Sequence, residues 1–190
     1  EPRFEKEGLL IEGASTNEII HSNAFADASW VTIAATKDST TALAPDGTNT
    51  AVSVTGTTTG GLYQVLTLTA STEYTFSTFF KKEVGKDSRI YCRDAATSAN
   101  AAYQGFDLET GTLVGDIVET GTWSGASAKI IPVGDSWFKA ELTCTIGTDT
   151  TIRVGYYAIG GVQITFWGCQ TEALPFASSY IPTTTTAVTR

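Results

Sequence analysis

Period-two alternation of apolar and polar residues is the feature that most constrains the fold of this chain. Over residues 74–81, Tyr74, Phe76 and Phe80 share one face while mainly polar residues share the other, as in a strand with one buried face. Residues 89–93 and 137–144 repeat the pattern, which predicts that Ile90, Cys92, Phe138, Ala140, Leu142 and Cys144 point inward. Further strands are predicted at 8–12, 50–55, 63–68, 104–108, 128–132, 151–157 and 162–171.

Short glycine-bearing turns separate these segments, and helical patterns are hard to find. Residues 94–102 are rich in Ala but too short and polar to predict more than a turn or loop. Strands at this spacing without helices predict an all-β fold, an antiparallel two-sheet β-sandwich with jelly-roll topology. We expect one domain over residues 1–190, with 181–190 as an edge strand or an exit linker. The predicted turns are 45–47, 59–61, 109–111, 124–125 and 160–161.

The charge balance limits the kinds of partner. The chain has 12 Lys and Arg against 20 Asp and Glu, a net charge of −8. Such a chain repels phosphate backbones and anionic lipid surfaces, and it has no apolar run of the roughly 18 residues that a spanning helix needs. We therefore expect neither a nucleic acid nor a membrane as partner.

Residues suited to catalysis are scarce. The one histidine, His21, is predicted to be a surface or capping residue, and no pattern of a nucleophile, a zinc protease or a phosphate loop occurs. Cys92, Cys144 and Cys169 lack the spacing of a zinc site. They are predicted to be small buried thiols, with one disulfide as the alternative. We predict no catalytic residue, no metal site and no cofactor.

Structural calcium is weighed separately, because it needs only several oxygen ligands converging from a loop. Glu12, Asp46 and Glu172 are potential donors. No loop carries the alternating carboxylates of a calcium site, so the sequence does not support one.

Large aromatic residues fall on faces that a half-solvated sheet normally leaves polar. Phe79, Tyr91 and Trp137 each have a long donor side chain two residues away, and aromatic platforms beside such donors suit the apolar face and hydroxyl rim of a sugar. Packing beneath a bent sheet or a covering loop is the alternative for each. Trp30 and Trp167 are predicted to anchor the core, whereas Trp123 lies in a turn-rich segment with little core to enter. The predicted carbohydrate-binding residues are Phe79, Lys81, Tyr91, Arg93, Trp123, Trp137, Lys139, Tyr157 and Gln170.

Several segments in chain order resemble the carbohydrate-binding, jelly-roll modules of bacteriophage tail fibre, tailspike and other virion proteins. The C-terminal segment is the most specific, with Cys169 where that family usually has Ala and Thr171 where it usually has an apolar residue. The segments are GLLIEGASTN (8–17), SNAFADASW (22–30), APDGTNTA (44–51), YTFSTFFKK (74–82), GFDLETGT (105–112) and FWGCQTEALPFASSYIPTTTTAVTR (166–190).

The resemblance implies a sandwich related to family 4 and family 9 type carbohydrate-binding modules, with its ligand in a concave sheet or at a loop-lined rim. It also implies that the chain is part of a longer virion protein. That family's ligand residues are poorly defined at the motif level, so the site residues above rest on the alternation alone.

The predicted function is that of a non-catalytic carbohydrate-binding module in a phage tail or virion protein. It would bind a polysaccharide or cell-surface glycan by stacking and hydrogen bonds, beside neighbouring domains of its parent. A structural spacer or assembly domain without a ligand, packed as a homotrimer in a fibre, is the alternative. A third hypothesis is a polysaccharide-cleaving jelly-roll enzyme, in which Tyr91, Arg93 and Gln170 would meet as in a lyase.

Overall fold

A computed structural model describes residues 3–5, 8–10 and 13–190, and the regular structure in this part of the chain consists of β-strands. The strands are β1 (Arg3–Glu5), β2 (Gly8–Leu10), β3 (Thr16–Asn17), β4 (Val31–Ala42), β5 (Ala51–Thr67), β6 (Glu73–Lys81), β7 (Asp87–Asp94), β8 (Ala101–Asp107), β9 (Thr112–Thr120), β10 (Ser124–Val133), β11 (Trp137–Thr145), β12 (Thr151–Ile159), β13 (Gln163–Glu172) and β14 (Val188–Thr189).

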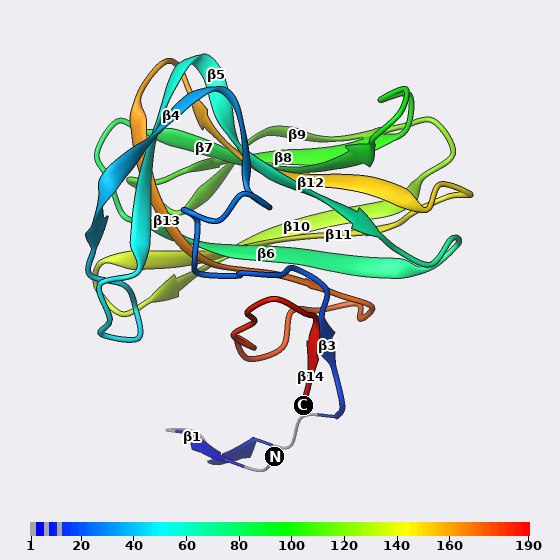
Figure 1. The fold of residues 1–190 in the computed structure, drawn as a ribbon, viewed down its shortest axis with the longest axis horizontal. Helices are drawn as coiled ribbons and strands as arrows, with labels where there is room; N and C mark the ends of the chain where they lie inside the picture. The colour runs from blue at the N-terminus through cyan, green and yellow to red at the C-terminus, as the bar shows by residue number, and fades with distance from the viewer. Residues whose placement is uncertain (1–2, 6–7, 11–12) are drawn as a thin grey trace.

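The strands form a sandwich of two layers (Figure 1). One hydrogen-bonded sheet runs β10-β11-β6-β13-β5-β12-β7-β8-β9, with β4 also paired to β5. It folds over at β5, which pairs through its first half with β13 and through its second half with β12. We call β6, β10, β11 and β13 with the first half of β5 the lower layer, and β7, β8, β9 and β12 with the second half of β5 the upper layer. All pairings are antiparallel, so the predicted antiparallel two-sheet sandwich of jelly-roll type is confirmed.

Strand β5 corrects the predicted turn at 59–61, because these residues belong to one strand. The strand bends sharply just before them, where a Cβ atom on Gly56 would lie 2.9 Å from the backbone nitrogen of Gly60. The glycines serve a close approach of neighbouring strands. A Cβ atom on Gly60 would lie 2.0 Å from the carbonyl oxygen of Ala34, and one on Gly61 would lie 1.8 Å from that of Tyr156. A strand with side chains at both positions could not pair with β4 and β12 in this register.

Two long strands, β4 and β9, escaped prediction, as did the short strands β1 and β3. β4 and β9 are mainly exposed or half-buried along their described lengths, so neither shows the alternation that marks a strand in the sequence. The predicted turn at 124–125 belongs to β10, whereas those at 45–47, 109–111 and 160–161 are confirmed. Residues 95–100 form the expected loop between β7 and β8. Of the predicted strand 8–12, β2 forms the first part, and 11–12 lie outside the described residues.

The hydrophobic core lies between the two layers. The residues predicted to point inward are all buried, and the largest fully buried side chains include Phe76, Phe80, Phe106, Tyr156 and Phe166. Trp30 joins this core as predicted. Trp167 is also buried, at 3% exposure, but in a second cluster with Ala44, Ala51 and Trp137.

The C-terminal segment lies against the outer face of the lower layer, below it in Figure 1. Lys139 of β11 donates hydrogen bonds to backbone carbonyls of Ala177 and Ser178, and Thr75 of β6 donates one to Leu174. The Pro-Thr run 182–186 forms no edge strand; Thr183 instead donates a hydrogen bond to the Ile19 carbonyl. Within 181–190 only β14 is a strand, and it pairs with β3. No described segment covers the outer face of the upper layer in the same way (Figure 1).

Candidate functional site

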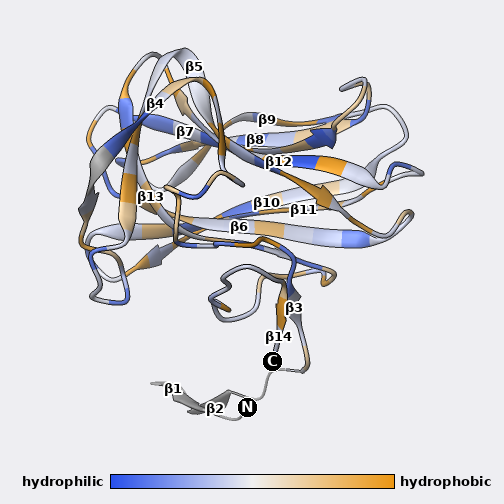
Figure 2. Ribbon diagram, in the orientation of Figure 1, coloured by the Kyte–Doolittle hydropathy of each residue, from blue (hydrophilic) through white to orange (hydrophobic). Residues whose placement is uncertain are grey.

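The uncovered outer face of the upper layer carries tyrosines and arginines in place of the small polar residues usual on a solvated sheet. Strand alternation puts them there, because Ile90, Cys92, Val154 and Tyr156 of the same strands point into the core. Figure 2 accordingly marks hydrophilic stretches on β7 and β12. We call this surface the Tyr–Arg face, and define it by Tyr63, Arg89, Tyr91, Arg93, Tyr103, Arg153 and Tyr157.

Strand pairing brings the tyrosines together at the centre of the face. Tyr91 on β7 is the Cα partner of Tyr103 on β8 and of Gly155 on β12. Because a Cβ atom on Gly155 would lie 2.1 Å from Cε1 of Tyr91, the absence of a side chain there leaves room for the tyrosine ring. That ring stacks on Tyr157 with the centroids 4.3 Å apart and an interplanar angle of 9°. The two rings form a rigid aromatic platform.

Each arginine of the face lies over a tyrosine. The Cζ atom of Arg153 is 4.3 Å from the ring centroid of Tyr63, and that of Arg89 is 4.7 Å from the centroid of Tyr103. The Cζ atom of Arg93 is 5.7 Å from the ring centroid of Tyr91. Attraction between a guanidinium and an aromatic ring holds the side chain in place and leaves its N–H groups free to donate.

Buried polar atoms on this face lack partners. The Nε atoms of Arg89, Arg93 and Arg153 are buried, yet none hydrogen-bonds to a described residue. Burial, and then the neighbouring hydroxyl of Tyr157, raise the pKa of Tyr91, so its hydroxyl stays protonated at neutral pH. Buried polar groups are normally satisfied, and three such atoms on one face indicate a surface made to meet a ligand or ordered water.

A hollow of about 320 Å³ lies within the Tyr–Arg face. Its floor and sides include Arg89, Tyr91, Arg93 and Tyr103, while Val118 and Thr120 of β9 line it from the adjoining strand. The hollow therefore combines aromatic surface with unpaired donors, a combination that can bind a small polar ring such as a sugar.

The structure brings three of the predicted site residues together here, namely Tyr91, Arg93 and Tyr157. Tyr63, Arg89, Tyr103 and Arg153 were missed as site residues. Alternation within the predicted strands 63–68 and 151–157 already puts Tyr63 and Arg153 on outward positions, and Arg89 lies two residues from Tyr91. What alternation does not supply is the pairing of β12 with both β5 and β7, which makes neighbours of residues far apart in the chain.

Other predicted site residues lie on the opposite side of the molecule, on the lower layer. Phe79 packs against Trp167 and Tyr180, with ring centroids 5.3 and 6.4 Å away. Trp137 is 7% exposed and belongs to the same cluster, and Lys81 is its Cα partner in the β6–β11 pair. The packing alternative describes the buried Trp137, whereas Phe79 is half-buried and lines a hollow of about 540 Å³ together with Lys139.

Lys139 and Gln170 are likewise engaged within the protein. Burial lowers the pKa of Lys139, whose ammonium lies 3.4 Å from the Glu141 carboxylate and donates to the C-terminal segment. Gln170 is 1% exposed and hydrogen-bonds to Glu172 and to the backbone N–H of Ile181. Because it lies in the lower layer, it does not meet Tyr91 and Arg93 as the lyase hypothesis requires.

The structure corrects the expectation that Trp123 has little core to enter. Its side chain is 3% exposed and belongs to the main core. The indole N–H donates a 3.0 Å hydrogen bond to Asp149, whose loop closes over that end of the sandwich. A Trp in a turn-rich segment is buried here because a second loop, distant in sequence, packs beside it.

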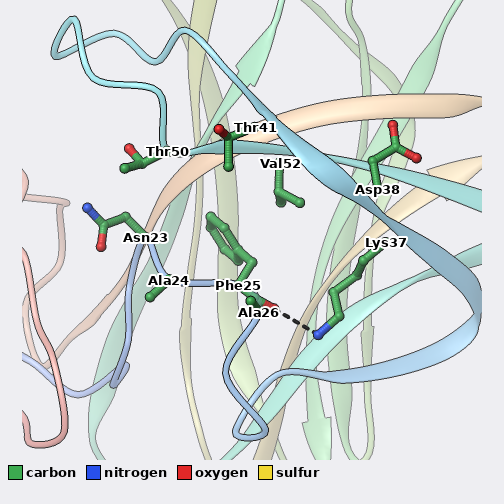
Figure 3. Close-up of a pocket in the computed structure, with 9 residues that line it drawn as sticks. All are labelled: Asn23, Ala24, Phe25, Ala26, Lys37, Asp38, Thr41, Thr50 and Val52. Carbon is green, nitrogen blue, oxygen red and sulfur yellow. Dashed lines mark hydrogen bonds between the residues drawn. The ribbon is translucent and has the colours of Figure 1, made fainter.

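A second hollow, of about 480 Å³, lies between the 23–26 segment and β4 (Figure 3). It is largely apolar, and its charged groups are already partnered. Lys37 donates a 2.8 Å hydrogen bond to the Phe25 carbonyl, and Asp38 accepts one of 2.6 Å from Gln163. Burial lowers the pKa of Lys37. Because its two charged groups are already partnered, this hollow is a weaker candidate than the Tyr–Arg face.

Groups that could support metal or nucleophilic chemistry do not gather in the described residues. No three His, Cys, Asp or Glu side chains there form a cluster suited to a metal ion. The buried carboxylate of Glu172 accepts hydrogen bonds from Ser15, Ser178 and Gln170; Asp46 caps its own turn at Thr48. Glu12 lies outside the described residues. His21 lies 3.4 Å from Asp27.

The three cysteines are buried free thiols, as predicted. Burial raises the pKa of the Cys169 thiol to about 12 and that of Cys92 well above its usual value. Cys92 and Cys144 approach from the two layers, with their sulfur atoms 3.5 Å apart. Among the described residues, no helix has the length and apolarity that crossing a bilayer requires.

Comparison with known proteins identifies a solved structure that shares this fold. No protein-family model and no curated protein sequence matches the chain. The CBM22-1 xylan-binding domain of Paenibacillus barcinonensis Xyn10C is similar in structure, with a TM-score of 0.51 and 13% identity over 86% of this chain and 94% of that domain. At that identity the likeness establishes a shared fold.

Two more distant structures are similar with a TM-score of 0.48 each, too low to add to that conclusion. TmCBM61 in complex with β-1,4-galactotriose is 15% identical over 82% of this chain and 97% of that one. The enzymatically active domain of tailspike protein 4 from bacteriophage CBA120 is 12% identical over 82% of this chain, which spans 21% of the tailspike chain.

Proposed function

We propose that this chain is a non-catalytic carbohydrate-binding domain whose ligand lies on the Tyr–Arg face. The observation that carries the proposal is the half-buried ring of Tyr157, held by its stack on the buried ring of Tyr91 and flanked by arginines whose buried Nε atoms lack partners. The fold shared with a xylan-binding domain supports it, because that fold accommodates sugars in at least one protein.

The chemistry of the face suits a sugar. Tyrosine rings offer flat apolar surface to the C–H face of a pyranose, and guanidinium groups donate to its hydroxyls. Because the rings are already held by stacking and by cation–π contacts, little side-chain freedom is lost when a ligand binds. A carboxylate pair, Asp87 and Asp107, lies at one end of the face, but Asp107 already accepts hydrogen bonds from the backbone N–H groups of Glu109 and Thr110, so we infer binding without turnover.

The parent context is a separate part of the proposal. The sequence segments that resemble phage virion modules support a place in a tail fibre, a tailspike or another virion protein, where many copies would give avidity to a weak single site. The partners would then be a polysaccharide or cell-surface glycan and the neighbouring domains of that protein.

The test is affinity electrophoresis of the purified domain through gels containing neutral and acidic polysaccharides. We expect retardation by at least one glycan, without new reducing ends after prolonged incubation. Tyr157→Ala should weaken retardation by about fivefold. Phe176→Ala is the matched control, since Phe176 is 49% exposed and lies on the C-terminal segment away from the face.

Two outcomes would contradict the proposal. Absence of retardation by every glycan, together with a trimer in sedimentation experiments, would favour the assembly domain instead. Retardation that Tyr157→Ala leaves unchanged would remove the Tyr–Arg face as the binding surface.

A further inference from the structure

The arginines of the Tyr–Arg face have no counter-ions within the described residues. Lys86, Lys129 and Lys139 form ion pairs with glutamates. Arg89, Arg93 and Arg153 take part in no ion pair and no hydrogen bond with a described residue, although acidic residues outnumber basic ones in this chain. Three half-buried arginines therefore lie together on this face without a carboxylate partner, although the chain as a whole has an excess of carboxylates.

Two of these charges face each other. Arg93 and Arg153 are Cα partners in the β7–β12 ladder, a position where like charges repel and destabilise a sheet. A single anion between the two guanidinium groups would remove the repulsion and satisfy their free donors. Arginine is suited to this role, because its planar fork binds a carboxylate through two parallel hydrogen bonds.

The carboxylates near the face are confined to one end of it. Asp87 and Asp107 are Cα partners at the end of the β7–β8 pair, beyond Arg89, whereas Arg93 and Arg153 lie toward the other end. Asp107 is engaged by the backbone N–H groups of Glu109 and Thr110. The face is therefore positive at one end and acidic at the other, which favours a ligand bound in one direction.

We propose that the Tyr–Arg face binds an acidic polysaccharide, with a sugar carboxylate held between Arg93 and Arg153 and adjoining sugar rings on the tyrosine platform. This inference rests on the proposed function and specifies its ligand class. Arg89 and Arg93 are four residues apart on β7, about 13 Å in a strand. That distance exceeds one sugar ring, so the two ends of the face contact different units of the chain.

The charge of the remaining surface argues against a ligand with a phosphate at every unit. A domain with a net charge of −8 repels a densely charged backbone, while three arginines suffice for a glycan with separated carboxylates. Single-stranded nucleic acid, which also combines stacking with arginine contacts, is therefore an outcome of the test rather than the proposal.

The decisive comparison uses the unmodified protein in gels of a partly methyl-esterified pectin, whose free carboxylates are separated along the chain, and of the fully methyl-esterified form. The two polymers have the same sugar backbone, and complete esterification removes the charge. We expect the partly esterified pectin to retard the domain about tenfold more strongly, with the difference shrinking as salt is added. Polygalacturonate serves as a densely charged uronate, dextran sulfate as a sulfated glycan, xylan and galactan as neutral ones, and oligo-dT as the nucleic acid.

Arginine variants then locate the site. Arg93→Gln and Arg153→Gln should each reduce uronate binding about tenfold and reduce any binding to neutral glycans less, because the glutamine amide still donates to hydroxyls but carries no charge. Lys82→Gln is the matched control, because it removes one exposed positive charge beyond the end of β6 in the lower layer. Circular dichroism and a thermal melt establish that each variant is folded.

The outcomes separate this inference from the proposed function. Binding to neutral glycans with no preference for uronates, weakened by Tyr157→Ala, would overturn the inference and leave the proposed function standing. No binding to any polysaccharide would overturn both. Stronger binding to dextran sulfate than to uronates would refute the carboxylate assignment, and stronger binding to oligo-dT would refute the glycan.

Discussion

Gly155 provides the space that the ring of Tyr91 occupies, since a Cβ atom there would lie 2.1 to 2.3 Å from ring and hydroxyl atoms of the tyrosine. The pair lies directly opposite across the β7–β12 ladder, so the tyrosine ring lies over the neighbouring strand. Its position on the sheet depends on the missing side chain at residue 155.

Replacing Gly155 with Ala should therefore displace Tyr91 and break its stack with Tyr157. We expect a loss of about 1–3 kcal/mol in the free energy of unfolding, as for other overpacked sites, and weaker glycan binding. Urea denaturation of the single variants and of Gly155→Ala/Tyr91→Ala measures the effect. In the Tyr91→Ala background the glycine substitution should cost little, and equal costs in both backgrounds would rule out this contact as the cause.

The repulsion between Arg93 and Arg153 should make the stability of the free domain depend on salt. Added salt screens this repulsion and should raise the free energy of unfolding of the unmodified protein. In Arg153→Gln the repulsion is absent, so the increase with salt should be smaller. The comparison is with Lys82→Gln, which alters the net charge equally away from the face. Urea denaturation at about 0.02 M and about 0.5 M NaCl measures the gain. Identical salt dependence in the two variants would show that the pair contributes no repulsion.

The acidic end of the face should give a pH dependence. Partial burial, and then Asp107, raise the pKa of Asp87, so the folded protein binds this proton more tightly than the unfolded chain does. The contribution of Asp87 to stability is therefore most favourable at low pH and is lost as pH rises through the raised pKa. Asp87→Asn should stabilise the domain near pH 7 relative to the unmodified protein, and the benefit should vanish near pH 3.

Urea denaturation between about pH 3 and about pH 7 checks this dependence. Asp116→Asn, at an exposed position on β9, is the control for the loss of one negative charge. If the stabilisation of Asp87→Asn relative to the unmodified protein grew toward low pH, this would contradict a raised pKa of Asp87 in the folded protein.

The buried carboxylate of Glu172 should stabilise the covered side of the molecule. It accepts hydrogen bonds from Ser15, Gln170 and Ser178 and thereby links β13 to both terminal segments. Glu172→Ala leaves these donors unsatisfied, and we expect it to lower the free energy of unfolding by about 2–3 kcal/mol. Glycan binding by the folded fraction should persist, because Glu172 lies in the lower layer. A cost below about 0.5 kcal/mol would show that water replaces the carboxylate.

Local sequence patterns predicted which face of each strand points outward, but not which outward face stays open. Phe79 and Tyr91 are equivalent by alternation, since both are aromatic residues on outer faces beside long donor side chains. They differ in what contacts them: the C-terminal segment, distant in sequence, places Tyr180 against the half-buried Phe79, whereas Tyr91 is buried beneath the stacked ring of Tyr157 on the neighbouring strand. Such long-range contacts leave no periodic signal in the sequence.

Glycines limited the prediction for a related reason. A Gly-Gly pair is a strong turn signal, and 160–161 obeys it, whereas Gly60 and Gly61 lie inside a strand. The difference depends on the close backbone approach of β4 and β12, which only the assembled sheet reveals. Similarly, Arg153 and Tyr63 belong to the Tyr–Arg face because β12 lies between β5 and β7, a neighbourhood that the local sequence does not indicate.

The passage of β5 from one layer to the other also bears on how the domain comes apart. Because one strand supplies hydrogen bonds to β13 at one end and to β12 at the other, neither layer can separate without breaking pairings that hold its counterpart. The sandwich is therefore a single cooperative unit, without a seam along which half of it could open. The Tyr–Arg face inherits the global stability of the domain, because local opening of the upper layer requires disruption of the strand that both layers share.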